Sequence, residues 1–331
     1  MTAGRGIAQK TKNETEMTIH RGMLTRDYWM KWNFTKCVGC EICSVVCPKS
    51  ALTHVDAVLE GGHMVRKQSV DVDENKCVNC GTCVIACPTH AISITINGKK
   101  EIPVVEYETF PKFIDKTVFH KEFFDFRLKD FVIDNCSVDV ISYDAERDTM
   151  RVDFENCIHC RQCEIASDGA FFVDQAWEGS VDLHTERCVE GCVACTEICP
   201  TSALHVNAEG KVTLADYFCI KCGACMQICP IKPKYEEKAF EFESNGVHVK
   251  RSYQELINMD ELAVKVERWR VNHTPVSSAS WVEALRKLSD DKAKSVEIDR
   301  KRALKRADLI MALRGTVVSV DAPAVPNRPR K

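Results

Sequence analysis

The sequence of 331 residues lacks a long apolar segment. No run approaches the roughly 18 consecutive apolar residues that a membrane-spanning helix needs. The first residues, MTAGRGIAQKTKNETEM, also lack the hydrophobic core of a secretory signal peptide. We therefore expect a cytoplasmic protein with no membrane span.

A strong excess of charge of either sign is absent as well. The formal net charge is −3 at pH 7, so the chain has no overall positive field for phosphates, and we do not expect nucleic acid as a partner. That value counts cysteines as neutral. A [4Fe-4S] core with four thiolates carries about two negative charges, so a chain with five such clusters would be nearer to about −13.

Cysteine is what the sequence has in abundance. The 20 cysteines fall mostly in tight runs, which favours metal ligation in a reducing cytosol over a disulfide framework. The run Cys-x-x-Cys-x-x-Cys-x-x-x-Cys-Pro is typical of ferredoxins with two [4Fe-4S] clusters, in which the fourth cysteine of each run binds the cluster of the other run. Zinc uses the same Cys-x-x-Cys pairs, but it needs neither the third cysteine nor the Cys-Pro step.

Residues 37–109 contain two complete runs, which begin at Cys37 and Cys77. Short apolar stretches follow each Cys-Pro and predict a turn into a strand, hence an α+β unit of the βαββαβ type. The 29 residues between the two runs exceed the 19 at the corresponding place in the last unit, and with Gly61 and Gly62 they predict an extended hairpin. The predicted ligands are Cys37, Cys40, Cys43 and Cys87 for cluster 1, and Cys77, Cys80, Cys83 and Cys47 for cluster 2.

Residues 110–185 contain an incomplete unit. A cysteine triple begins at Cys157, but its fourth position is Ser167, and Cys136 stands alone 21 residues before the triple. When Cys136 is aligned with Cys87, the rule that fourth cysteines cross over assigns it to the cluster of the triple. The predicted ligands of cluster 3 are therefore Cys157, Cys160, Cys163 and Cys136. The missing triple would lie at Phe126, Lys129 and Val132, and none of these residues can bind a cluster.

All four ligands of one site in this unit are thus absent together, which favours a deleted cluster. We expect the phenylalanines of the segment to fill the emptied volume, because a void of that size would be costly. They are Phe110, Phe113, Phe119, Phe123, Phe124, Phe126 and Phe131. In the alternative, the triple binds a three-iron cluster and Cys136 is a free buried thiol. Ser137 and Asp168 replace the usual prolines, which would loosen this site.

Residues 186–245 contain two more runs. Three residues rather than two separate Cys188 from Cys192, so one extra peptide must bulge out between these ligands. The predicted ligands are Cys188, Cys192, Cys195 and Cys229 for cluster 4, and Cys219, Cys222, Cys225 and Cys199 for cluster 5. The 20 cysteines then give five [4Fe-4S] clusters with none left over.

Residues beside the ligands are candidates for tuning the clusters. Gly81 and Gly223 follow the second cysteine of their runs, where glycine can adopt a positive φ and aim amides at sulfur. Glu41 and Arg161 stand at the same position, so Arg161 would raise and Glu41 would lower a cluster potential, unless both are simply solvated. His159 lies between two ligands, and we expect it on the surface rather than bound to iron.

Two segments without cysteine flank the units. Residues 1–36 form a polar N-terminal extension that ends in aromatic residues, expected to form a lid over the first clusters or a docking surface. Residues 246–331 predict a helical tail, with a capping box from Ser280 to Glu283 and a longer helix over about 290–313. That helix is either a solvated basic face or an arm that docks on an acidic partner. Its basic residues are Lys301, Arg302, Lys305 and Arg306.

The tandem cluster units resemble the polyferredoxins of methanogenic archaea. The tail segments VSSASWVEAL (276–285) and DRKRA (299–303) are similar to the C-terminal region of the polyferredoxin subunit of formylmethanofuran dehydrogenase. The resemblance implies an anaerobe's electron-transfer subunit, attached to the molybdenum or tungsten subunit that reduces carbon dioxide before formyl transfer to methanofuran in methanogenesis. Longer members of that family carry four full units, whereas this chain has two full units and one depleted unit.

We therefore expect a non-catalytic chain that relays single electrons through five [4Fe-4S] clusters, with no catalytic residue of its own. In one alternative, the chain is a relay in a hydrogenase or heterodisulfide reductase assembly. In another, it is a stand-alone iron–sulfur enzyme. The last alternative requires a cluster with only three protein ligands, and the assignment of Cys136 removes the obvious candidate.

Overall fold

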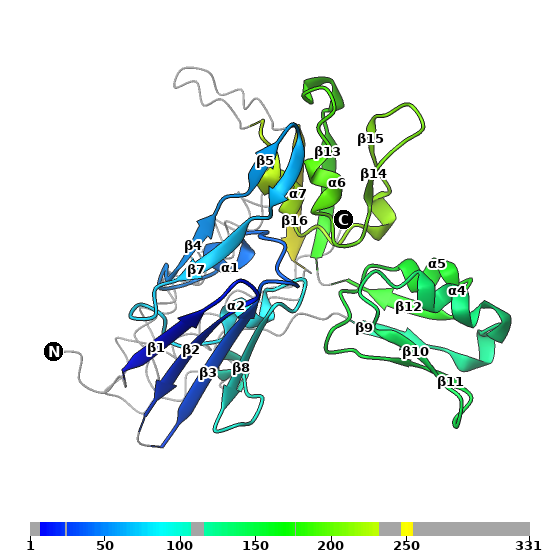
Figure 1. Ribbon diagram of the computed structural model, residues 1–331. Coiled ribbons are helices and arrows are strands. Elements are labelled where there is room, and N and C mark those ends of the chain that lie inside the picture. Colours follow the sequence, from blue (N-terminus) through cyan, green and yellow to red (C-terminus); the bar gives the residue numbers. More distant parts are fainter. Residues whose placement is uncertain (1–6, 24, 107–115, 176, 232–245, 254–331) are drawn as a thin grey trace, which may run out of the picture.

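The computed structural model of the chain describes residues 7–23, 25–106, 116–175, 177–231 and 246–253 (Figure 1). The helices predicted for the tail, their capping box and basic face, and Phe110 and Phe113 lie outside these residues. None of the helices in the described ranges is long and apolar enough to cross a membrane.

Three copies of one β–α–β–β–α–β unit follow one another along the chain (Figure 1). In each copy the first strand pairs with the last, and the two middle strands pair with each other, always antiparallel. The predicted tandem ferredoxin-like units are confirmed as small sheets with short helices.

The elements of the three units are these. The first unit has β3 (Asp27–Asn33), α1 (Ile42–Val45), β4 (Leu52–Val55), β7 (Ser69–Val72), α2 (Thr82–Ile85) and β8 (Ile92–Ile96). The second has β9 (Lys116–Phe119), α4 (Lys129–Asp134), β10 (Ile141–Asp144), β11 (Thr149–Val152), α5 (Gln162–Ala166) and β12 (Phe171–Asp174). The third has β13 (Trp177–Leu183), α6 (Ala194–Glu197), β14 (Leu204–Val206), β15 (Val212–Leu214), α7 (Ala224–Ile228) and β16 (Val247–Tyr253). Shorter elements are α3 (Pro103–Glu106) and the 3₁₀ turns η1 (Lys121–Phe123), η2 (Phe126–Leu128), η3 (Thr185–Arg187) and η4 (Asp216–Phe218).

In each unit the opening strand comes before the first cysteine. β3 lies within the segment predicted as an extension, β13 begins within the range predicted for the second unit, and β16 lies in the range predicted for the tail. β13 and β16 pair over their full length and form the sheet of the third unit. Ligand spacing marks the loops and helices that hold clusters, but it carries no information on the flanking strands.

The N-terminal segment joins the sheet of the first unit. β1 (Ala8–Lys12) and β2 (Glu16–Gly22) extend it to the order β1-β2-β3-β8. Its inner face is fully buried against the cysteine loops, whereas Trp29 on the outer face is 45% exposed. The buried residues are Met17, Ile19, Met30 and Trp32.

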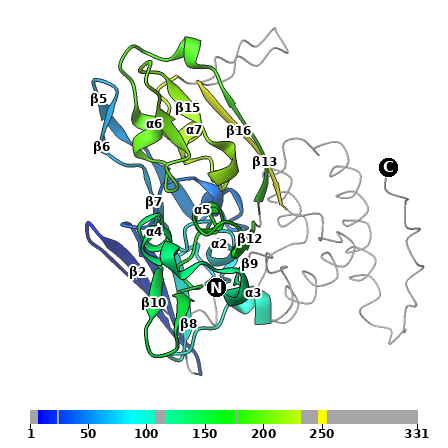
Figure 2. The same cartoon turned by 90° about the vertical axis from the view of Figure 1, so that its right-hand side faces the viewer.

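The longer connection in the first unit folds as the predicted hairpin. β5 (Val58–Glu60) and β6 (His63–Arg66) pair antiparallel around Gly61 and Gly62, which both have positive φ. In two views at right angles the hairpin reaches away from its own unit and lies beside α6 of the third unit (Figures 1 and 2).

One hydrophobic core joins the first and third units. It contains Val38, Ile42 and Val46 of the first unit together with Ala194 and Ile220 of the third. Ile158, at the edge of the second unit, also belongs to it. The second unit has its own core as well, and Gln162 ties it to the third unit by donating a hydrogen bond of 2.7 Å to the Thr201 carbonyl. The cysteine loops of the three units therefore meet near the centre of the molecule.

Candidate iron–sulfur cluster sites

Four of the five cysteine loops share a backbone bend with positive φ. The residue after the second cysteine has a φ of 66° to 86° at Glu41, Gly81, Arg161 and Gly223, and a short helix starts directly after it. The positive φ expected at the two glycines is confirmed, and glutamate and arginine adopt it too, although it is costly for residues with a Cβ. The bend lets the next backbone amide donate to the sulfur of the second cysteine, as at Cys40, Cys80 and Cys160.

The structure brings the cysteines together in five groups of four. In the first group, burial raises the pKa of Cys43 well above its usual range, and the nearby thiolates of Cys40, Cys87 and Cys37 raise it further. The other four groups show the same mutual influence among their members. In every group the three clustered cysteines meet the fourth cysteine of another run, in the sets that the crossover rule predicts. The assignment of each set to one bound cluster stays a prediction.

Three apolar cavities each have all four cysteines of one set in their walls. They are lined by the sets predicted for cluster 2, cluster 3 and cluster 5. In the described part of the chain, no three cysteine, histidine or acidic side chains gather closely enough to hold a single metal ion. All 20 cysteines lie in that part and all are free thiols. Four thiols around one apolar cavity are the donor set that a [4Fe-4S] cluster requires.

Burial makes these thiols weak acids. It raises the pKa of Cys77 and of Cys195 to about 12, and the backbone amide of Asn79 and the Arg21 guanidinium offset part of the effect at Cys77. Iron binds the thiolate form, so loading a site must release these protons. The positive charge of iron then compensates for four thiolates in an apolar cavity, which no described side chain at these cavities could do alone.

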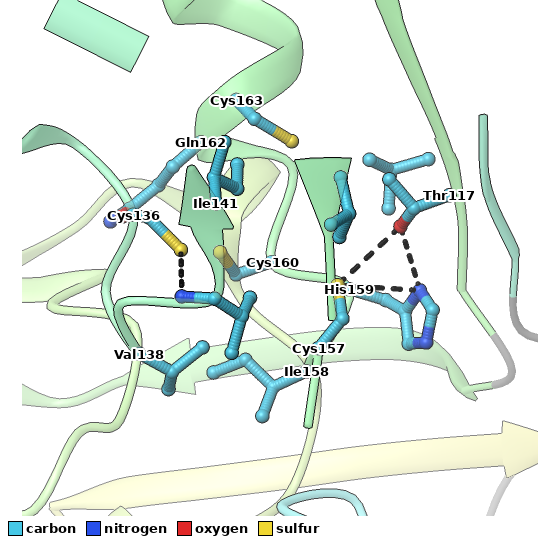
Figure 3. Close-up of a pocket in the computed structure, with 13 residues that line it drawn as sticks. Thr117, Cys136, Val138, Ile141, Cys157, Ile158, His159, Cys160, Gln162 and Cys163 are labelled. Atoms are coloured by element: carbon cyan, nitrogen blue, oxygen red, sulfur yellow. Dashed lines mark hydrogen bonds between the residues drawn. The ribbon is translucent and has the colours of Figure 1, made fainter. Parts of the chain in front are cut away.

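Cys136, the cysteine of the second unit that stands outside the triple, occupies a ligand position. Its sulfur accepts a hydrogen bond of 3.4 Å from the amide of Val140, four residues on, and Cys47 and Cys87 accept the same bond from Ala51 and Ala91 at 3.3 Å. The sulfur of Cys136 also lines one cavity with the three cysteines of the triple (Figure 3). This placement supports four ligands over a three-iron cluster with a free thiol.

Ser167 stands in the equivalent place of the site without cysteines. Its hydroxyl accepts a 3.0 Å hydrogen bond from the amide of Phe171, again four residues on. The serine therefore keeps the turn of a fourth ligand while it offers iron no sulfur. Val132, which stands at the third position of the missing triple, is fully buried in the core of the unit.

Aromatic side chains fill the volume beside Ser167. Phe119 and Phe171 have ring centroids 4.8 Å apart, and Phe124 contacts Phe119 at 5.3 Å and Phe126 at 5.0 Å. The expectation of a phenylalanine core is thus confirmed for these residues. Phe123 and Phe131 differ, because they are 74% and 57% exposed.

The expectation of a surface position for His159 is wrong. Its side chain is only 8% exposed, and its Nδ1 lies 2.9 Å from Thr117 Oγ1 and 4.0 Å from Cys157 Sγ (Figure 3). Thr117 comes from β9, which covers this loop. The histidine therefore packs beneath the loop and holds it against the sheet.

The bulge predicted between Cys188 and Cys192 has a structural use. Gly191 takes a φ of 75°, and the amide of Val193 donates a 3.1 Å hydrogen bond to the Gly62 carbonyl of the β5–β6 hairpin. Val193 has a φ of −126°, so the positive-φ bend of the other loops is missing here. The extra residue thus adapts this loop to the neighbouring unit.

Arg21 is a residue near the candidate sites that sequence reasoning missed. Its side chain is 6% exposed, and it donates to Asn79 Oδ1 at 3.0 Å and to the carbonyls of Glu74 and Cys77 at 2.7 and 3.0 Å. These acceptors belong to the loop that begins the cluster 2 triple. The alternation of Met17, Ile19 and Arg21 on one face of β2 is the signal that could have placed Arg21 inward.

We expect Arg21→Met to lower the reduction potential of cluster 2 by tens of millivolts, since about 59 mV corresponds to a tenfold change for a one-electron couple. A buried positive charge beside the cluster stabilises the reduced state. EPR-monitored redox titration checks this, with Lys31→Met as the control because Lys31 is a half-exposed cation on the same sheet. Equal titration curves for Arg21→Met and wild type would contradict the prediction.

Comparison with known proteins agrees with this geometry. Two family models, both described as a 4Fe-4S dicluster domain, match residues 36–91 and residues 69–166 with 180–241. Together they cover more than half of the chain. The chain belongs to the 4Fe-4S dicluster ferredoxin-like proteins. As such a protein it binds multiple [4Fe-4S] clusters.

Several subunits of reductases are among its relatives. The B subunit of the anaerobic dimethyl sulfoxide reductase of Haemophilus influenzae is 29% identical over 111 aligned residues, which cover 25% of this chain and 53% of the relative. The B subunit of the polysulfide reductase of Wolinella succinogenes is 31% identical over 98 residues, 24% of this chain and 50% of the relative. The chain thus spans about half the length of these two curated relatives.

A solved structure shares the fold over most of the chain. One subunit of the formate dehydrogenase–heterodisulfide reductase–formylmethanofuran dehydrogenase complex from Methanospirillum hungatei superposes with a TM-score of 0.62. The match covers 78% of this chain and 91% of that subunit, with 24% sequence identity. The predicted family is thus supported at the level of the dicluster ferredoxin fold.

Proposed function

We propose that this chain is the electron-relay subunit of a redox complex that contains a molybdenum or tungsten formylmethanofuran dehydrogenase. In the proposal five [4Fe-4S] clusters are bound by the twenty cysteines in the predicted sets. Bound clusters supply one-electron transfer. The protein holds the thiolates, excludes water and fixes the distances between sites.

The observation that carries the proposal is a continuous series of neighbouring cysteine sets. Within the first unit, Cys83 of the cluster 2 set and Cys43 of the cluster 1 set lie in one buried core. Between units, Cys40 of the cluster 1 set and Cys222 of the cluster 5 set lie in another. The series ends within the third unit, where the next link joins Cys225 of the cluster 5 set to Cys195 of the cluster 4 set.

The second unit lies beside this series. His159 lies between the first two cysteines of its triple. Its ring centroid is 6.3 Å from that of His90, which lies three residues after Cys87 of the cluster 1 set. Gln162 bonds to Thr201, which follows Cys199 of the cluster 5 set. Cluster 3 would therefore lie at the junction of the other two units, and the site marked by Ser167 would lie on its far side. In this arrangement the lost cluster does not interrupt the path between the first and third units.

The complex is proposed from two likenesses. The tail resembles that of the formylmethanofuran dehydrogenase polyferredoxin subunit, and the structural match comes from a complex that includes that enzyme. The same complex contains heterodisulfide reductase and formate dehydrogenase. A relay role toward heterodisulfide reductase is therefore the second candidate.

We expect about 20 iron atoms per chain, four for each of five clusters. Iron and acid-labile sulfide analysis of the anaerobically purified chain measures this number. We also expect the native chain to co-purify with a molybdenum or tungsten subunit. A partner set with heterodisulfide reductase but without such a subunit would favour the second candidate, and a clearly lower iron content would contradict the five-cluster assignment.

A further inference from the structure

Gln68 lies at the contact between the first and third units. It directly precedes β7, and its side chain is fully buried. The Nε2 amide donates two hydrogen bonds, one of 3.1 Å to the Val38 carbonyl and one of 2.8 Å to the Ala224 carbonyl. One side chain thus ties two backbone segments that are far apart in sequence.

These two carbonyls belong to cluster-binding loops. Val38 lies between Cys37 and Cys40 of the cluster 1 set, and Ala224 lies between Cys222 and Cys225 of the cluster 5 set. The amide bridges the two loops where they pack together, since Val38 and Cys40 share one buried core with Cys222 and Ala224.

The space for this bridge exists because residue 39 is glycine. Gly39 has a φ of 62°, and a Cβ at that position would lie 1.9 Å from Gln68 Cγ. The corresponding residues in three other loops are Asn79, His159 and Lys221, which carry side chains at the same positive φ. In the cluster 1 loop, a side chain from outside the loop occupies this space instead.

The bridge is not explained by packing alone. The Oε1 atom of Gln68 is buried and has no hydrogen-bond partner in the described residues. An apolar side chain of the same length would avoid burying an unpaired oxygen, but it would leave the Val38 and Ala224 carbonyls without this donor. The contacts of the β5–β6 hairpin already hold the periphery, where Glu197 accepts a 2.6 Å hydrogen bond from the Met64 amide.

We propose that Gln68 is a positioning residue that fixes the separation of the cluster 1 and cluster 5 loops, and thereby sets the rate of electron exchange between the first and third units. This inference rests on the proposed relay function. The two amide hydrogen bonds hold the loops in register, since a directional bond restricts distance and orientation where apolar contact does not.

Gln68→Met tests this, because methionine matches glutamine in length and shape but cannot donate to either carbonyl. The matched control is Gln162→Met, which removes the glutamine amide that ties the second unit to the third. Both variants are purified anaerobically as the full chain. Iron is counted, and EPR spectra are recorded after full reduction and after rapid freezing with substoichiometric reductant.

The readout is the magnetic interaction between clusters 1 and 5, which depends steeply on their separation. Cys87→Ala removes a ligand of cluster 1, and Cys199→Ala removes a ligand of cluster 5. The interaction between these clusters is the part of the EPR line broadening that disappears in both variants. We expect Gln68→Met to keep its iron, to reduce this broadening, and to slow electron redistribution between the units several-fold. Gln162→Met keeps the broadening of the wild type.

A second variant approaches the contact from the other side. Gly39→Ala displaces Gln68 by its added Cβ, and it decides the matter if Gln68→Met loses iron. The variant that decides is Gln68→Met if it keeps its iron, and Gly39→Ala otherwise. Wild-type broadening and wild-type exchange rates in that variant would overturn the inference while leaving the relay intact. Equal losses in Gln162→Met would also overturn it, and a wild-type chain without exchange between the units would contradict the proposed function together with this inference.

Discussion

Cys136→Ala is expected to remove one cluster and leave the other four. The iron content falls from about 20 to about 16 atoms per chain, or to about 19 if the triple retains a three-iron cluster. The reason is geometric: the Cys136 sulfur shares one cavity with the triple and accepts the same amide bond as Cys47 and Cys87. Iron analysis with EPR of the reduced and oxidised chain measures the change.

Ser167→Ala provides the matched control. Ser167 occupies the equivalent turn of the site without cysteines and bonds to the Phe171 amide. Its replacement removes one buried hydrogen bond, worth about 1 kcal/mol of folding stability, and is expected to leave the iron count unchanged. An unchanged iron content and spectrum in Cys136→Ala would show that the single cysteine is no ligand, and would restore the three-iron alternative.

The cysteine pattern predicted much of this arrangement because a cluster imposes its geometry on the chain. Three ligands on one loop and a fourth from a distant run require a tight turn, a short helix and two halves that fold together. The sets formed around Cys136 and around Cys47 could therefore be predicted from spacing alone. The hairpin at Gly61 and Gly62 could also be predicted, because a longer connection between paired strands has few other solutions.

The contacts between units could not be predicted in this way. Gln68 and Arg21 act on loops far from them in sequence, and nothing local distinguishes Gln68 from a surface residue. The opening strands of the first and third units fell outside the predicted ranges, because those boundaries followed the cysteines. In β2 the alternation of Met17 and Ile19 with polar residues was available as a sign of a half-buried strand. His159 was misplaced because its burial depends on β9, which lies some 40 residues earlier in the chain.

Removal of iron is expected to unfold most of the chain. Units of about 60 residues bury too little surface to be stable by apolar contact alone, and here thiols line the cavities that a cluster would fill. Without iron each site becomes a void whose walls lose their packing partners. Far-UV circular dichroism during anaerobic treatment with an iron chelator should show loss of secondary structure that follows iron release.

The loss is expected to be uneven, because one half of the second unit has replaced its cluster by side chains. Phe119, Phe124 and Phe171 pack against one another there without iron. Phe119 of β9 lies opposite Phe171 of β12 in the antiparallel pair of these strands. Hydrogen exchange of the iron-free chain is therefore expected to retain protection longest where Phe119 of β9 pairs with Phe171 of β12, away from the cluster 3 cavity that Thr117 and Val173 line. We expect protection to be lost first in β14 and β15, which line the cavity of the cluster 5 set. Uniform loss of protection in all three units would mean that the phenylalanine core does not stabilise its half of the unit alone. Protection that survives throughout the iron-free chain would mean that the clusters contribute little to folding.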